Sequence, residues 1–359
     1  MSTKLTRWVF SGKKVTVVAL AGCLIGGLVA CGSDSGGTAS VEGLTPKTIG
    51  YVDLIGSGAM QRRFFSYFSA GADALGWEVQ LQDAKGDPNR ANTEAINLLN
   101  RGVDALVVSC ADSAPMSPAL RLAKTKNIPA VQVGCPMTDE NAWDASFPIN
   151  DAAVGKKLGE YVAGAIGPRS EVGILGDTTI LSGKVRGEGV AEGLKSAEVN
   201  IVGDQSVSLT DPVGATRKTL SSYMTANPDL KAAFAVYDFF APPAGDAVSA
   251  AGKTDTVGVY SFFADAVNAP YMKRPDSALR AVADGPVEQV SLVAVDQLLA
   301  HFEKGQPFNS NAASDLDISY EIFTADSLPE IGEDFLGPYS VGDYLPAYLT
   351  RWQQTYGSK

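Results

Sequence analysis

The sequence predicts an α/β protein with two doubly wound lobes, each built around a parallel sheet. Short apolar, β-rich runs alternate with amphipathic helical stretches from residue 48 onward, and the alternation begins again near Asp151. Strand–helix–strand repeats favour right-handed crossovers and therefore parallel sheets. The chain has 359 residues, 45% of them apolar, which is long enough for two such lobes.

The first lobe is predicted from an alternation that ends near residue 134. Apolar residues spaced by three and four, such as Phe64 and Phe68, predict its first helix, and Gly102 predicts a helix end. The expected strands are 48–55, 77–84, 104–110 and 128–134, and the expected helices are 59–75, 91–102 and 115–126.

The second lobe repeats the alternation. Its expected strands are 171–177, 200–208, 231–238 and 256–262, and its expected helices are 151–166, 183–197, 212–226 and 241–251. A helix over 286–304 follows, and then a tail rich in Tyr, Pro and Gly with one clear strand at 319–325. Periodicity does not assign the helix over 286–304 to either lobe.

The composition argues against some classes of function. The chain has 40 acidic and 29 basic residues, and four of the basic ones lie in residues 1–30, which hold no acid. The rest therefore has 25 basic against 40 acidic residues, a net charge of −15. Nucleic acid would require a basic face, so we expect no such partner. A single histidine excludes most His-based triads and multi-histidine metal sites, and we expect no metal and no cofactor.

The amino terminus is predicted to direct export. Four basic side chains in residues 1–14 precede the apolar run at 15–30, which is typical of a signal peptide. The ending Leu-Val-Ala-Cys resembles the bacterial lipobox, which implies cleavage before Cys31 and a diacylglycerol on its sulfur. The alternative is a membrane-spanning anchor, although this run is just short of the roughly 17–25 residues that span a bilayer. Gly, Ser and Thr in 31–47 predict a flexible tether to the extracytoplasmic membrane surface.

Several segments of the body resemble the ribose-binding-protein branch of the periplasmic solute-binding proteins that serve ABC importers. The matching segments are TIGYVDL (48–54), LNRGVDALVVSCADS (99–113), NIPAVQVG (127–134), INDAAVGKKLGEYV (149–162), KVRGEGVAEGL (184–194), NPDLKAAFAVYD (227–238) and VADGPVEQVSLVAVDQLL (282–299). The resemblance implies the type I periplasmic-binding-protein fold, in which three crossing segments form a hinge. It also implies a ligand in the cleft at the carboxyl ends of the strands and closure of the lobes by hinge motion.

The resemblance sets the expected domain boundaries. Residues 1–30 are the signal peptide and 31–47 the tether. Residues 48–150 and 285–309 are expected to form the N-terminal lobe, to which the helix over 286–304 returns. Residues 151–284 and 310–359 are expected to form the C-terminal lobe and the tail.

The family's ligand-binding positions carry over only in part. Its aromatic pair falls near Met60-Gln61, and its Asp-Arg pair falls on Gly134-Cys135, so both are absent. Its arginine before the Arg-Gly-Glu-Gly run becomes Lys184, which keeps the charge and loses the planar fork. The candidate ligand contacts are Asp112, Asp151, Lys184, Tyr237, Asp238, Ser261 and Asp284. Asp151 has a second interpretation as a helix cap.

Aromatic residues gather on the second-lobe side of the expected cleft: Tyr237, Phe239, Phe240, Tyr260, Phe262 and Phe263. Rings of this kind stack on the C–H faces of a sugar, but only some of the polar ligand-binding residues of the family are present here. A less hydroxylated ligand, or a cationic one held by rings and carboxylates, therefore stays open. The alternative is that about half of these rings belong to the core, because strand residues alternate sides.

Cys110 and Cys135 follow the third and fourth strands. In the strand order that the resemblance implies, these strands are neighbours about 4.8 Å apart, which suits a disulfide. An extracytoplasmic location would let the bond persist. The alternative is two free buried thiols.

The function that follows is an extracytoplasmic, lipid-anchored binding protein, not an enzyme. It captures a small polar solute, a sugar or sugar-like molecule, and presents it to ABC permease subunits, and we expect a monomer. The first alternative is a sensor that presents its closed form to a membrane signalling receptor. The second is a glycoside-acting enzyme that uses Asp112 and Asp284 as paired carboxylates.

Overall fold

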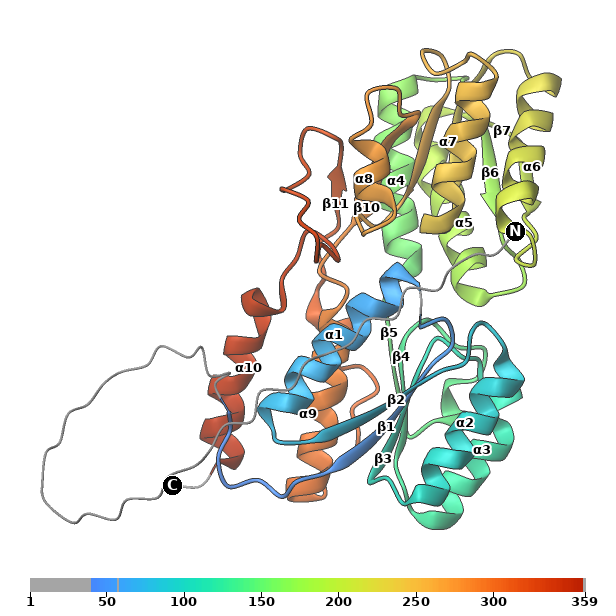
Figure 1. Ribbon diagram of the computed structural model, residues 1–359. Helices are drawn as coiled ribbons and strands as arrows, with labels where there is room; N and C mark the ends of the chain where they lie inside the picture. Colours follow the sequence, from blue (N-terminus) through green and yellow to red (C-terminus); the bar gives the residue numbers. More distant parts are fainter. Residues whose placement is uncertain (1–39, 57, 358–359) are drawn as a thin grey trace, which may run out of the picture. The chain divides into compact units, whose positions relative to one another are not determined.

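Two β-sheets organise the chain (Figure 1). The computed structural model describes residues 40–56 and 58–357, which belong to one compact unit. The predicted signal peptide, the lipidation site Cys31 and residues 31–39 of the predicted tether lie outside the described residues. Val41, in the rest of that tether, is buried, and its N–H donates to the Ala74 carbonyl at 2.9 Å.

The first sheet has the strand order β2-β1-β3-β4-β5, and all its pairs are parallel. Its strands are β1 (Thr48–Asp53), β2 (Glu78–Asp83), β3 (Ala105–Ser109), β4 (Ala130–Gly134) and β5 (Ala145–Pro148). Helices α1 (Ala59–Ala74) and α9 (Gln289–Lys304) pack together on one face, and α2 (Pro88–Arg101) and α3 (Ser113–Lys126) on the other (Figure 1). A short 3-10 helix, η1 (Glu140–Ala142), precedes β5. We call this sheet with these helices the first lobe.

The second sheet has the order β11-β10-β9-β8-β6-β7, and only β11 pairs antiparallel. Its strands are β6 (Glu171–Gly176), β7 (Asn200–Ser206), β8 (Leu230–Ala235), β9 (Gly258–Phe262), β10 (Leu279–Asp284) and β11 (Glu321–Phe323). The second lobe is this sheet with α4 (Asp151–Ile166), α5 (Leu181–Leu194), α6 (Pro212–Ala226), α7 (Ala241–Ala250), α8 (Asn268–Met272) and the 3-10 helices η2 (Lys195–Ala197) and η3 (Asp238–Phe240). The predicted fold class, two parallel-sheet α/β lobes, is therefore confirmed.

The chain passes between the two lobes three times before its last helix. It leaves the first sheet after β5 and enters the second lobe at α4; it returns after β10 to α9, and then goes back to β11 through 305–320, which contains the 3-10 helix η4 (Ser314–Leu316). Helix α9 packs on α1, β4 and β5. A final helix, α10 (Val341–Tyr356), packs on α1 and α9, so the predicted tail 310–359 contacts both lobes.

Helix starts differ from the sequence prediction where a cap sets them. Helix α2 begins at Pro88, three residues early, because the Asp87 side chain accepts from Asn89 N–H at 2.9 Å and proline suits the first helical turn. It ends before Gly102, whose φ of 82° is the left-handed conformation that glycine adopts at helix ends.

Strands β5 and β10 and helices α8 and α10 were not predicted from the sequence. Strand β5 has only four residues and ends in a proline, which fits an edge position. In β10 the apolar run is interrupted by Arg280, where the pairing with β9 shifts register. Helix α10 contains Pro346 and many aromatic residues of weak helix propensity; a capping box at Ser340 and burial of Trp352 stabilise it.

Helices α4 and α5 pack with their backbones in contact. A Cβ on Gly155 would lie 2.4 Å from the Arg186 carbonyl oxygen, and one on Gly189 would lie 2.5 Å from that of Ala152. Gly159 makes the same kind of contact with the Val190 carbonyl at 2.4 Å. Glycine is therefore required on both helices, and this close approach fixes the first turn of α4 beside the middle of α5.

None of the helices in the described part of the chain has both the length and the apolar character needed to cross a bilayer.

Candidate functional site

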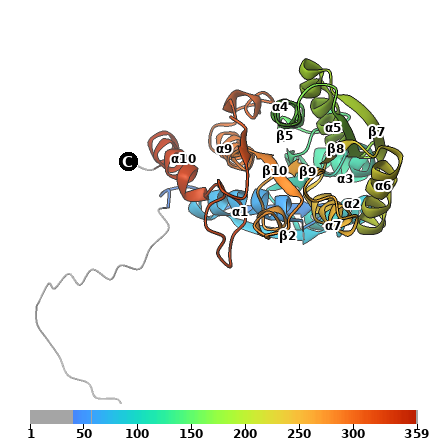
Figure 2. The ribbon, with the colours of Figure 1, turned by 90° about the horizontal axis from the view of Figure 1, so that it is seen from above.

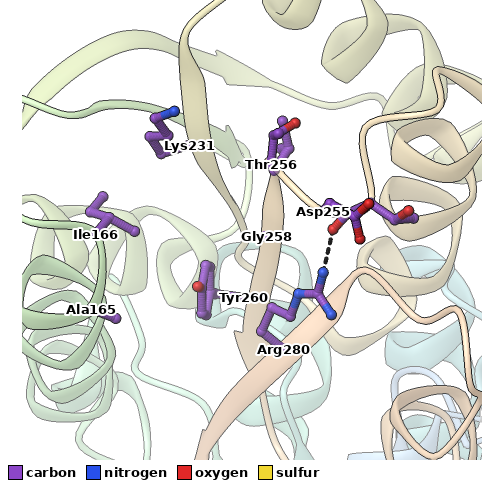
Figure 3. A pocket seen from close by; sticks show the side chains of 10 residues that line it. Ala165, Ile166, Lys231, Asp255, Thr256, Gly258, Tyr260 and Arg280 are labelled. Atoms are coloured by element: carbon purple, nitrogen blue, oxygen red, sulfur yellow. Dashed lines mark hydrogen bonds between the residues drawn. The ribbon is translucent and has the colours of Figure 1, made fainter.

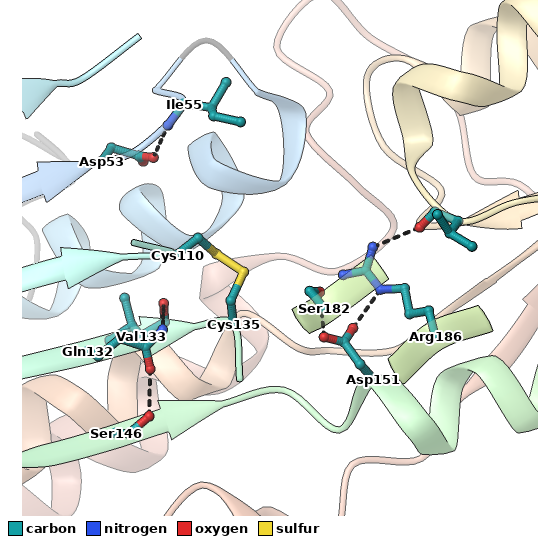
Figure 4. The surroundings of a disulfide bond; sticks show 11 residues. Asp53, Ile55, Cys110, Gln132, Val133, Cys135, Ser146, Asp151, Ser182 and Arg186 are labelled. Atoms are coloured by element: carbon teal, nitrogen blue, oxygen red, sulfur yellow. Dashed lines mark hydrogen bonds and ion pairs between the residues drawn. A yellow bond between two sulfur atoms is a disulfide. The ribbon is translucent and has the colours of Figure 1, made fainter. Parts of the chain in front are cut away.

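A buried charge pair lies where α4 and α5 meet. Asp151, the first residue of α4, accepts from the Ser182 hydroxyl and from Arg186 Nε, each at 2.5 Å (Figure 4). Burial raises the pKa of the Asp151 carboxyl, and Arg186 and Ser182 oppose that rise. The cap of α4 is instead Asn150, whose side chain accepts from Ala153 N–H, so the interpretation of Asp151 as the helix cap is wrong.

Arg186 was not predicted as a site residue. Its side chain is 7% exposed, whereas that of Lys184, which was predicted, is 53% exposed and pairs with Glu188 at 3.8 Å. Two residues along a helix are about 200° apart, so these two side chains point in opposite directions. The helical period was the signal that could have identified Arg186.

Aromatic rings surround the Arg186 guanidinium. Its carbon lies 4.8 Å from the centroid of the Phe263 ring, 5.6 Å from that of Phe262 and 5.8 Å from that of Tyr237. Nη1 donates to the Val236 carbonyl at 3.1 Å. These contacts hold the guanidinium in one position through cation–π attraction and hydrogen bonds.

Tyr237 and Asp238 follow β8 at its carboxyl end. The Tyr237 hydroxyl donates to Asp177 Oδ2 at 2.8 Å, and its ring stacks on Phe239 with centroids 5.1 Å apart. Burial, and then the Asp177 charge, raise the Tyr237 pKa well above its usual value, so the hydroxyl keeps its proton. Asp238 lies beside the buried Asp265; burial first, and then Asp238, raise the pKa of Asp265. Asp265 is fully buried and accepts from the N–H groups of Val267 and Asn268, so of these two carboxyls Asp238, which is 8% exposed, is the candidate to accept from a ligand.

Asp284 is fully buried at the end of β10. Arg63 of α1 donates to both of its oxygens, Nη1 at 3.0 Å and Nη2 at 3.2 Å, and Arg63 Nε also donates to Glu288. The Asp284 oxygens also accept from the N–H groups of Ala264 at 2.8 Å and Gly285 at 2.7 Å. Arg63, Asp284 and Glu288 thus form an ion-paired cluster that joins the first lobe to the second, which we call the crossing cluster.

Two further predicted residues have partners of their own. Asp112 caps α3, and its carboxylate also accepts from the Thr138 hydroxyl at 2.8 Å, which ties the loop after β3 to the loop after β4. Ser261 is buried in β9, where its hydroxyl donates to the carbonyls of Ala235 at 2.9 Å and Tyr237 at 3.2 Å. Both side chains hold neighbouring backbone in place.

The predicted disulfide between Cys110 and Cys135 is confirmed, with Cα atoms 4.8 Å apart. It lies at the carboxyl ends of β3 and β4, near Asp53 and near the Asp151–Arg186 pair (Figure 4). Burial, and then the nearby Asp83, raise the pKa of Asp53 to about 7, while its hydrogen bond from Ile55 N–H opposes the rise. Asp53 is a second site candidate missed from the sequence; a lone carboxylate ending a buried strand was its signal.

Two non-glycine residues at this edge have left-handed backbone. Cys110 has a φ of 59° and Phe263 a φ of 64°. Conformations of this kind cost about 1–3 kcal/mol each and gather at functional sites. Cys110 carries the disulfide and Phe263 covers Arg186, so both strained positions lie at the carboxyl ends of the strands.

A cavity of about 380 Å³ lies elsewhere, at the amino end of the second sheet (Figure 3). Lys231, Gly258, Tyr260 and Arg280 line it, on β8, β9 and β10. The Tyr260 ring folds back over Gly258, where an added Cβ would lie 2.8 Å from it. Tyr260 therefore points away from the carboxyl ends of the strands and is not one of the rings around Arg186.

Within residues 40–56 and 58–357, no group of three or more His, Cys, Asp and Glu side chains is placed to hold a metal ion.

The comparisons with known proteins agree with this architecture. The model of the "periplasmic binding protein domain" family matches residues 56–306. The ribose import binding protein RbsB of Escherichia coli K12 is 28% identical over 193 residues, covering 52% of this chain and 63% of that protein, so the match spans less than two thirds of its length. The xylitol-binding protein of Mycolicibacterium smegmatis is 24% identical over 297 residues, covering 81% of each chain.

Solved structures show the same fold. The 5-methylthioribose transporter solute-binding protein of Thermotoga lettingae superposes with a TM-score of 0.66 at 21% identity, covering 78% of this chain and 87% of that one. A periplasmic solute-binding protein of Actinobacillus succinogenes with bound D-allose gives 0.66 at 20% identity, covering 78% and 98%. At these identities the likeness establishes the fold alone. With the family model matched over 56–306, the chain belongs to the periplasmic binding protein domain family.

Proposed function

We propose that the protein is an extracytoplasmic substrate-binding protein that captures a small polar solute, a sugar or sugar-like molecule, and delivers it to an ABC importer. The observation that carries the proposal is the Asp151–Arg186 pair, buried among aromatic rings at the carboxyl edge of the second sheet in a chain of this family. Open α/β sheets bind ligands at that edge. Relatives named for binding ribose and xylitol support the class of solute.

The chemistry of the carboxyl edge suits hydroxyl groups. Among the described residues, Arg186 uses Nε and Nη1 for protein contacts, so Nη2 is the atom we assign to a ligand oxygen. Asp238 accepts from ligand hydroxyls, and Tyr237 and Phe263 offer ring faces to C–H groups. Both Asp177 oxygens already accept from protein groups, Oδ1 from Thr179 and Oδ2 from Tyr237. The ligand contacts predicted for Asp112, Lys184, Ser261 and Asp284 stay predictions, although each of these side chains has a protein partner in the structure.

A thermal-shift screen with pentoses, hexoses, polyols, nucleosides and quaternary amines tests this proposal. A true ligand at a hundredfold excess over Kd stabilises the protein by about 2.7 kcal/mol. We expect a sugar or polyol to raise the melting temperature of the wild type. We expect Arg186→Lys, which keeps the charge and loses the planar fork, to lose that ligand-induced rise.

Arg217→Lys is the matched control, because Arg217 pairs with Asp246 at 2.7 Å on the half-exposed surface of the same lobe. It should keep the full ligand-induced rise. If only quaternary amines raise the melting temperature, the ligand is not a sugar. If the ligand raises the melting temperature of Arg186→Lys as much as that of the wild type, Arg186 does not belong to the site.

The proposal includes a lipid anchor on Cys31, which holds the protein at the outer face of the cell membrane. The lipobox-like ending Leu-Val-Ala-Cys supports it. We expect the wild type in the membrane fraction, with a mass increase from acyl chains on the mature amino terminus. Cys31→Ala should lose the acyl mass; an identical mass shift in both proteins would contradict the anchor.

A further inference from the structure

The segment 319–356 contacts both lobes and lies beyond the matched family region, which ends at residue 306. It contains β11, a connection over 324–340 and α10. We call it the C-terminal brace. Figure 2 shows α10 outside α1 and α9, while β11 lies beside β10.

The brace is attached to the second lobe by its first part. Strand β11 pairs with β10, with Glu321 opposite Asp284 of the crossing cluster. The Tyr320 hydroxyl donates to the Asn150 carbonyl at 3.2 Å, where the chain first enters the second lobe. Lys273 Nζ, after α8, donates to the Leu328 carbonyl at 3.4 Å.

The brace is attached to the first lobe by α10. Trp352 is fully buried, and its Nε1 donates to Asp296 of α9 at 2.7 Å. Arg351 pairs with the same carboxylate at 2.6 Å. The Tyr344 ring lies 6.3 Å from that of Tyr67 on α1. Each lobe thus holds one end of the brace.

Between these attachments the brace lies directly against the crossing residues. A Cβ on Gly285 would lie 2.9 Å from the Ser319 carbonyl oxygen. A Cβ on Gly337 would lie 2.8 Å from the guanidinium carbon of Arg63, the cation of the crossing cluster. Gly285 lets the backbone of the crossing approach the backbone of the brace, and Gly337 leaves room for the Arg63 guanidinium against the brace.

We propose that the C-terminal brace is a positioning element for ligand capture: a fourth connection between the lobes that limits how far they open. A connection fixed at both ends restricts the relative positions of the lobes. It therefore reduces the conformational entropy that is lost when the lobes close on a ligand. This inference rests on the proposed function for its biological role, but its mechanical content is testable without any ligand.

The test measures the distance between the lobes in unliganded protein by electron paramagnetic resonance. Spin labels are placed at Arg121→Cys on α3 and Lys218→Cys on α6, which are exposed, in the full chain with Cys23→Ala and Cys31→Ala. Two samples release the brace. One carries Trp352→Ala. The other carries a protease site inserted after Glu330, in an exposed stretch of the connection, and is measured before and after cleavage.

We expect the unmodified protein to give a narrow distribution of label-to-label distances. In both samples with a released brace, we expect this distribution to shift to longer distances and to lose its main peak. Gln354→Ala, an exposed position on the same helix, is the control and should leave the distribution unchanged. A lower melting temperature with unchanged distances in both samples would overturn the proposal, because α10 would then only cover the first lobe. A failed ligand screen has no bearing on these distances, so the two proposals fail separately.

Discussion

Arg63→Met should destabilise the protein by about 3–5 kcal/mol at neutral pH, the usual cost of removing one partner from a buried ion pair. The substitution leaves Asp284 and Glu288 buried without their cation. Equilibrium urea unfolding at pH 7 measures the loss. Arg217→Met, which breaks the half-exposed pair with Asp246, is the control, and its cost should stay within about 1 kcal/mol.

The loss caused by Arg63→Met should depend on pH. Burial raises the pKa of Glu288 and Arg63 opposes that rise, so the substitution raises it further. A carboxyl whose pKa is raised on folding contributes its stability below the unfolded pKa and loses it as the pH rises. The difference between wild type and Arg63→Met should therefore be small near pH 4 and grow toward pH 7. Equal losses at both values would show that lost packing, and not charge, is the cause.

Replacing both Cys110 and Cys135 by serine should cost about 3 kcal/mol, the entropy expected for opening a loop of this length. Thermal or urea unfolding of the oxidised wild type and the double variant measures the difference. Adding a reductant should lower the stability of the wild type and leave that of the variant unchanged.

Thiol counting provides an independent check of the disulfide. A denatured, unreduced chain with Cys23→Ala and Cys31→Ala should contain no free thiol. Two labelled thiols per chain would contradict the bond. A stability loss well below about 1 kcal/mol in the double variant would show that the Asp112–Thr138 contact already holds the same two loops together.

The sequence predicts the central strands well because they are apolar runs, such as β3 and β4, in which every residue is buried. It fails for β10, where Arg280 interrupts the run, and for α10, whose stability comes from the capping box and from packing of Trp352. In both cases tertiary contacts decide the structure, and local sequence does not record them.

The charged side chains were harder to predict than the strands. The sequence pattern predicts Asp151 and the exposed Lys184 as site residues, whereas the buried partner of Asp151 is Arg186. For Asp284, no local pattern indicates that Arg63, 221 positions away, donates to both of its oxygens. Long-range ion pairs of this kind are set by the fold.

The glycine-mediated contact of α4 with α5 affects how binding would be regulated. Asp151 and Arg186 lie on two helices whose backbones are in contact, so we expect the two side chains to move together as one rigid unit. If the lobes close on a ligand by hinge motion, as proposed, this pair would move as a preformed part of the binding site, and neither charge would have to be desolvated again in each cycle. Ligand selectivity would then depend on this preformed half of the binding site, while the hinge motion would determine only when the lobes close.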